Sequence, residues 1–172
     1  MKRIICFPLC LSLLTVLTAC GSSPKVNPSE LLQHLRFYGT EFSFPCTYGE
    51  ISAEFGLDNE DDSFYDSYGY LYYDLTSSGE SVAVIGVEGE KTEPIGSQEI
   101  EMLEISDEHL SALELGDIVC DANFKALTKA LGKPNSQMES GSSTIITYQW
   151  DGVELNIIFH DDQPHQYTFV KR

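Results

Sequence analysis

The sequence predicts an α+β domain in which helices pack on one face of an antiparallel β-sheet. Three patterns favour this fold. Residues 144–160 alternate apolar and polar side chains on both sides of a central turn, as a half-buried hairpin does. Residues 122–131 repeat apolar side chains with helical spacing. Helix-start signals at Thr47 and Asp121 are each followed by a stop, a polar loop and strands, which indicates a degenerate tandem repeat.

The first elements expected in the domain are a short helix and a hairpin. Asn27 is a helix cap, and Glu30 three residues later completes the start signal. This helix must be short, because the apolar period changes to two within residues 35–44. Tyr38 and Gly39 lie in the middle of that stretch and predict a hairpin turn.

The first round of the expected repeat begins at a capping box made by Thr47 and Glu50. Strands are predicted at residues 68–75 and 81–88, joined by a Ser-Ser-Gly turn, and a further strand at residues 100–105. This order is typical of an antiparallel meander.

The second round begins with Asp121 as the predicted cap of a helix over residues 122–131. A polar loop follows at residues 135–143, and then a hairpin whose Asp-Gly pair predicts a type I′ turn. Pairing outward from that turn fixes the register. The pairs on the buried face are Trp150–Val153, Tyr148–Leu155, Ile146–Ile157 and Thr144–Phe159. Tyr167 and Phe169 continue this face on a last strand.

Composition and charge exclude several classes of protein. Of the 172 residues, 42% are hydrophobic, with nine Tyr and nine Phe, which is typical of a folded domain and not of a disordered chain. Asp and Glu outnumber Lys and Arg by 27 to 10, so the net charge is −17. Nucleic acid is not an expected partner, because phosphate binding requires clustered cations. The acidity is consistent with a basic protein partner, or it serves solubility alone.

The first twenty residues resemble a bacterial lipoprotein signal. Lys2 and Arg3 precede an almost wholly apolar stretch over residues 4–17, and Leu17-Thr18-Ala19-Cys20 resembles a lipobox. The resemblance implies a signal peptide over residues 1–19, cleavage before Cys20, and a diacylglyceryl group on the Cys20 sulfur. It therefore implies an exported chain that is anchored by lipid to the cell membrane and faces the extracytoplasmic side.

The rest of the chain then divides into a tether and one domain. Residues 20–29 are the lipidated end and a tether of mostly small residues, and residues 30–172 form a single domain. Without Lys2 and Arg3 the net charge is −19. Anionic lipid head groups repel such a domain, so the lipid and not a basic patch must hold it at the membrane.

Two cysteines remain in the predicted domain, Cys46 and Cys120. An exported domain with two cysteines favours a disulfide between them. The alternative is two buried, inert thiols, because free cysteine packs as a small hydrophobic side chain. Neither cysteine has a second ligand at zinc spacing, so no metal site is expected.

The sequence offers one candidate binding surface. Tyr68, Tyr70 and Tyr72 project from one face of a predicted strand and would form a platform for a peptide or a sugar. The alternative is that tyrosine is simply a favoured strand residue. The acidic run at residues 58–62 lacks the glycine and glutamate of an EF-hand loop, which favours a solvated loop.

No motif predicts catalysis or a cofactor. The chain lacks a nucleophile elbow, a phosphate-binding loop, a dinucleotide fingerprint and a zinc-protease motif. A thiol enzyme would need Cys46 or Cys120 beside a histidine. We therefore expect that the chain is not an enzyme and holds no cofactor.

Several segments resemble known modules. Leu131-Gly132-Lys133-Pro134 followed by Tyr148-Gln149-Trp150 and Val153-Glu154-Leu155 resembles β-lactamase-inhibitor-like proteins and SmpA-type lipoproteins. The whole chain, with Phe37-Tyr38-Gly39 and Phe44-Pro45-Cys46-Thr47, is similar to small lipoproteins of Gram-positive bacteria. This resemblance implies an α+β fold and leaves the activity open.

Together these patterns predict a non-enzymatic, lipid-anchored binding or accessory domain whose sheet contacts an extracellular protein or peptide. The alternative is a surface-tethered inhibitor of an exported hydrolase, acting through a loop such as residues 58–62.

Overall fold

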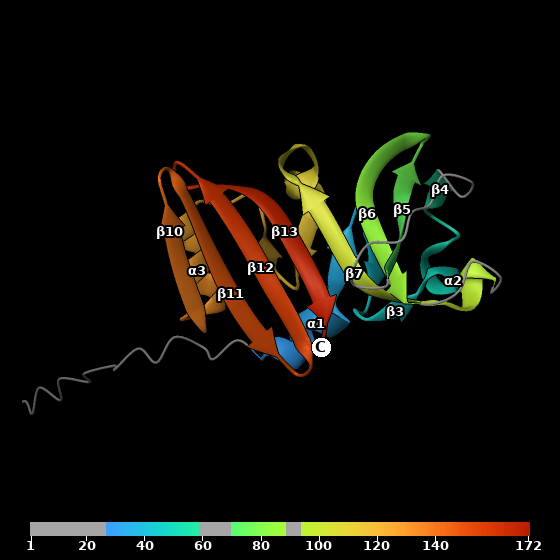
Figure 1. Cartoon of the computed structure of the whole chain (residues 1–172), viewed down its shortest axis with the longest axis horizontal. Coiled ribbons are helices and arrows are strands. Elements are labelled where there is room, and N and C mark those ends of the chain that lie inside the picture. Colours follow the sequence, from blue (N-terminus) through green and yellow to red (C-terminus); the bar gives the residue numbers. More distant parts are fainter. Residues whose placement is uncertain (1–26, 59–69, 89–93) are drawn as a thin grey trace, which may run out of the picture.

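The computed structural model of the chain describes residues 27–58, 70–88 and 94–172. Its main element is a nine-stranded antiparallel sheet (Figure 1). From edge to edge the strands are β10 (Ser136–Ser140), β11 (Ser143–Trp150), β12 (Val153–His160), β13 (Gln163–Lys171), β7 (Glu99–Ser106), β6 (Glu80–Glu88), β5 (Tyr70–Ser77) and β4 (Gly56–Asp58), while β3 (Cys46–Thr47) pairs with β7 off this path.

The large sheet consists of two four-stranded meanders joined side by side. One meander contains β10 to β13 and the other contains β4 to β7, and β13 pairs antiparallel with β7 where they meet. In Figure 1 this seam lies between the red β13 and the yellow β7. The last strand of each meander is therefore central in the sheet.

Short elements cover one face of the large sheet. A second sheet contains β2 (Thr40–Phe42), β1 (Leu35–Phe37), β8 (Leu113–Leu115) and β9 (Ile118–Val119). The helices are α1 (Pro28–Gln33), α2 (Tyr48–Ile51) and α3 (Phe124–Leu131), with 3-10 turns η1 (Ile95–Ser97) and η2 (Asp107–Ala112). None of the described helices has the length and apolarity that a membrane crossing requires.

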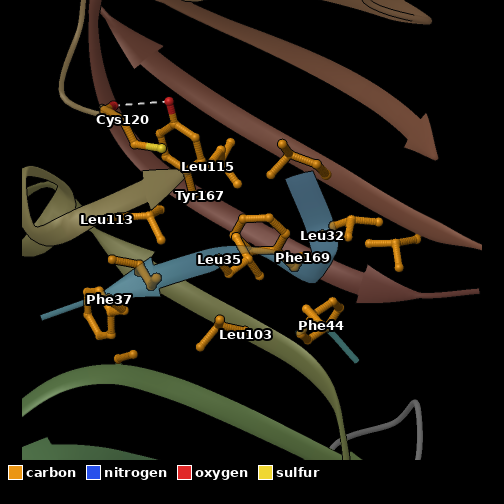
Figure 2. Packing of buried hydrophobic residues seen from close by; sticks show 14 of the residues in the cluster. Leu32, Leu35, Phe37, Phe44, Leu103, Leu113, Leu115, Cys120, Tyr167 and Phe169 are labelled. Atoms are coloured by element: carbon orange, nitrogen blue, oxygen red, sulfur yellow. Dashed lines mark hydrogen bonds between the residues drawn. The ribbon is translucent and has the colours of Figure 1, made fainter. Parts of the chain in front are cut away.

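A single hydrophobic core lies between the two sheets and under the helices. Figure 2 shows Leu35 and Phe37 of the small sheet facing Leu103 of β7 and Phe169 of β13. All four side chains are at most 2% exposed. Because β7 and β13 come from different meanders, the same core holds both halves of the large sheet together.

The expected α+β class is wrong, because the fold is mostly antiparallel sheet. The three α-helices have only 6, 4 and 8 residues, and the small sheet does much of the covering that helices were expected to do. A helix begins at or near each predicted start signal, but α1 and α2 end after six and four residues and strands follow within a few residues. Such short helices form by packing and not by propensity.

Several local predictions are confirmed. The Asn27 side chain caps α1 by accepting from the Ser29 N–H at 3.2 Å. Thr47 and Glu50 form the expected capping box of α2. Tyr38 and Gly39 have φ angles of +50° and +81° in the turn between β1 and β2. All four predicted pairs of the β11–β12 hairpin are present in the expected register.

Two predictions in the second half are wrong. The cap of α3 is Asn123, whose Oδ1 accepts from the Ala126 N–H at 3.0 Å, and not Asp121. Residues 136–140 are the edge strand β10 and not part of a polar loop. All five residues of β10 are exposed, so the sequence has no alternation to reveal the strand.

Candidate binding face

The small sheet and the helices cover one face of the large sheet. No described element covers the other face, which we name the open face. Burial alternates along β5 and β12, so every second side chain points to this face and is half-exposed. In the left half of Figure 1, α3 lies behind β10 and β11, on the covered side. The open face carries Met138, Ile145, Thr147, Gln149, Glu154, Asn156, Ile158, Gln166, Thr168, Val170, Met102, Glu104, Val84, Tyr70, Tyr72 and Asp74.

A line of hydrogen bonds fixes the side chains over β11 and β12. Thr147 Oγ1 donates to Asn156 Oδ1 at 2.8 Å, and Asn156 Nδ2 donates to Glu154 Oε1 at 3.0 Å. Arg172 also donates to Glu154, at 2.7 Å, and this contact holds the pKa of the Glu154 carboxyl below its usual value. This part of the open face is therefore rigid and charge-balanced.

Glu104 lies near the centre of the open face, on β7 between Thr168 of β13 and Val84 of β6. Partial burial raises the pKa of its carboxyl, and a hydrogen bond with Thr168 partly offsets the rise. None of the ion pairs formed within residues 27–58, 70–88 and 94–172 involves Glu104. Its desolvated carboxylate would gain from an approaching cation.

A hollow of about 180 Å³ beside Glu104 lies at the corner of β6, β7 and η2. Its polar lining includes Ser106, Glu108 and His109, and its β6 wall includes Val84. Two carboxylates and an apolar wall match a lysine or arginine side chain, which has an apolar stem and a charged end. Sequence reasoning missed this site, because Glu104 and Glu108 are unremarkable until β6, β7 and η2 are brought together.

The structure places two of the three predicted platform tyrosines on the open face. The Tyr70 and Tyr72 ring centroids are 6.3 Å apart at an interplanar angle of 66°, and both side chains are half-exposed. Gly86 lies opposite Tyr72, and a Cβ there would be 3.5 Å from the Tyr72 ring and 3.1 Å from the Met102 Cβ. Because Gly86 has no side chain, Tyr72 and Met102 can approach each other across it. Tyr68 lies outside the described residues.

Cys46 and Cys120 are both free and both buried, as the second of the two cysteine alternatives expects. Burial raises the pKa of Cys46 to about 12, and Glu50 and Glu99 add to the rise. Burial also raises the pKa of Cys120, and the Tyr167 hydroxyl donates to the Cys120 carbonyl at 3.0 Å. A nucleophilic thiol requires a lowered pKa, so neither environment suits a catalytic cysteine.

Two histidines meet at the β12–β13 turn. The ring centroids of His160 and His165 are 4.7 Å apart, His165 Nδ1 is 2.9 Å from Asp107 Oδ2, and His160 Nδ1 is 2.8 Å from the Ser143 hydroxyl. The part of the chain that the structure describes holds no group of three or more residues placed to bind a metal ion.

Besides Tyr68, two of the sequence-predicted features lie outside the described residues. Cys20 and the whole of residues 1–19 are not described. Asp58 ends β4, and the remaining residues of the acidic run, 59–62, are likewise outside.

Comparison with protein-family models, with curated proteins and with solved structures found no match to this chain.

Proposed function

We propose that this chain is a lipid-anchored, non-enzymatic binding or accessory domain outside the cell membrane, and that its open face contacts an extracellular protein or peptide. The observation that carries the proposal is the open face itself. It crosses both meanders without a covering element among the described residues, whereas the opposite face carries the hydrophobic core. An antiparallel sheet can leave one face to water, and the half-exposed tyrosines on this face favour its use as a contact surface.

The chemistry of the face indicates the chemistry of the partner. Tyr72 on β5 and Val170 on β13 are half-exposed and offer apolar contact, while Glu104 on β7 supplies a partly desolvated carboxylate between them. Tyrosine is enriched at protein interfaces. We therefore propose a partner that presents a lysine or arginine between apolar side chains, in agreement with the acidity of the whole chain.

The lipid anchor is the second part of the proposal, and the lipobox-like sequence ending at Cys20 supports it. The described domain begins at Asn27, only seven residues after Cys20. A seven-residue segment spans at most about 25 Å. The tether would thus keep the domain close to the lipid surface and leave partner binding to the protein surface.

The test is site-specific photo-crosslinking on living cells. A photoreactive phenylalanine analogue replaces Tyr72 on the open face, and in a matched control it replaces Val119, which is 45% exposed on β9 of the small sheet. We expect the position of Tyr72 to capture a defined protein that the position of Val119 does not capture.

A second variant tests the proposed charge contact. Glu104→Lys in the chain with the analogue at Tyr72 should abolish capture without changing the circular dichroism spectrum, because it opposes the cation of the partner. Identical capture from both analogue positions, or capture that survives Glu104→Lys, would refute the proposed face.

A further inference from the structure

The edge strand β10 is an unpaired β-strand edge at one end of the large sheet. β11 pairs with one side of β10, and no described strand pairs with its other side. All five residues of β10 are exposed. Alternate N–H and C=O groups of an edge strand point outward and can pair with another strand.

Met138, at the centre of β10, is the most exposed of the large apolar side chains in the described residues, at 60%. On the open face Met138 lies beside Ile145 of β11, and Ile145 lies beside Ile158 of β12; both isoleucines are half-exposed. This row of three apolar side chains would gain apolar contact if another strand were added beside β10. An apolar side chain in the middle of an open edge is a second, independent indication of a partner there.

The sequence of β10 complements itself when two copies run antiparallel. A two-fold axis at Met138 places Met138 opposite its own copy, Gln137 opposite Glu139, and Ser136 opposite Ser140. Gln137 Nε2 already donates to Glu139 Oε1 at 2.9 Å within the chain, and the same groups would meet across the axis. An axis at Glu139 would instead oppose two carboxylates, which is destabilising.

This register also satisfies the backbone. Only alternate residues of an antiparallel strand direct their N–H and C=O groups to a given neighbour. With the axis at Met138, each odd-numbered residue lies opposite an odd-numbered residue of the other copy, and each even-numbered residue lies opposite an even-numbered one. The residues whose N–H and C=O groups point away from β11 therefore lie opposite residues of the other copy whose groups point toward them.

We propose that the chain forms a symmetric dimer in which β10 pairs with β10 of a second copy, Met138 opposite Met138. The two large sheets then form one continuous sheet, with both open faces on the same side. A five-residue strand pair buries less surface than the roughly 1,200–2,000 Å² of a stable interface, so the dimer dissociates readily. Because each copy carries a net charge of −17, salt strengthens the association by screening repulsion.

The first experiment is disulfide trapping of the full chain. Met138→Cys is expressed in a bacterium that exports the chain, its membranes are mildly oxidised, and dimers are counted on a non-reducing gel. We expect a strong dimer band, because the introduced thiols lie opposite each other on the axis. The wild-type chain controls for the five native cysteines, and Val119→Cys, at a site 45% exposed on β9, controls for random collision.

Two further variants test the register. Glu139→Cys alone should cross-link weakly, since its two copies would be about 8 Å apart on the diagonal and beyond disulfide reach. Co-expression of Gln137→Cys with Glu139→Cys should restore cross-linking between the two chains. Equal trapping by Met138→Cys and Val119→Cys, or no trapping above the wild-type chain, would overturn the proposed dimer.

Sedimentation of the full chain in detergent measures the association constant and needs no introduced cysteine. Met138→Glu should lower the association constant about tenfold or more, because it removes apolar contact and opposes two charges on the axis. An association constant unchanged by this variant, or a wild-type chain that stays monomeric at every salt and protein concentration, refutes the dimer. Both readouts are independent of the open-face partner, so either proposal can fail alone.

Discussion

At the scale of single residues, burial decides what the two cysteines of the domain can do. Cys120 is fully buried beside Tyr167, and Cys46 is 5% exposed in β3. Burial is the largest cause of the raised pKa of each thiol, and neighbouring carboxylates add to it. At Cys120 hydrogen bonds with the Tyr167 side chain and the Leu115 backbone offset only part of the rise in pKa. These residues therefore act as small apolar side chains of the core, and their ionisation is coupled to unfolding.

This coupling predicts a loss of stability at alkaline pH. The unfolded chain loses the Cys46 proton above about pH 9, whereas the folded chain keeps it up to about pH 12. The resulting stability is complete below pH 9 and decreases as the pH rises toward 12. From pH 8 to pH 10, Cys46 alone should contribute a loss of about 1.4 kcal/mol in the free energy of unfolding.

Urea unfolding at pH 8 and pH 10 measures this loss. The matched control is Cys46→Ala, which removes the titrating group, so the difference between the two pH values should shrink by about the same amount. A pH dependence equal in the variant and the wild-type chain would contradict the raised pKa.

At the scale of single elements, sequence patterns predict structure where local signals and burial agree. The β11–β12 register was predictable because the turn dipeptide and the alternation of eight apolar and polar pairs specify the same alignment. Strand β10 was not predictable, because it is held by backbone hydrogen bonds and none of its side chains is buried. The α3 cap was placed two residues early, because Asp121 and Asn123 are both good caps and only the folded chain selects one.

The cap of α3 gives a prediction with its control built into the sequence. Asn123→Ala removes the side-chain oxygen that accepts from the Ala126 N–H, so it should cost about 1 kcal/mol of stability. Asp121→Ala removes an equally exposed side chain that does not cap the helix, and it should change stability by less than about 0.5 kcal/mol. Thermal unfolding of both variants compares them. Equal losses would show that Asp121 shares the capping role.

At the scale of the whole molecule, the sequence could not predict how the two meanders join. Pairing of β7 with β13 links segments about sixty residues apart, and no local pattern selects that neighbour. The join creates the open face, and it brings Glu104 beside Thr168. The tyrosines of β5 were predictable as one face of a strand, whereas the carboxylate at the centre of the candidate site was not.

The charge of the whole molecule also bears on the proposed lipid anchor. If residues 1–19 are removed, as the proposed lipid anchor requires, the remaining chain has a net charge of −19 and an anionic bilayer repels it. Two acyl chains on Cys20 would still hold it, since each buried methylene contributes about 0.8 kcal/mol. The proposal therefore makes membrane attachment depend on the sulfur of Cys20 and not on the surface of the domain.

We therefore expect Cys20→Ser to release the chain from the membrane or to leave an unprocessed precursor. Detergent-phase partitioning and gel mobility of the exported chain measure the two outcomes. The matched control is Cys46→Ser, which alters a buried thiol and should leave both partitioning and processing unchanged. If the Cys20→Ser chain is still processed and still partitions into detergent, the sulfur of Cys20 is not the anchor, and attachment must come from another part of the chain.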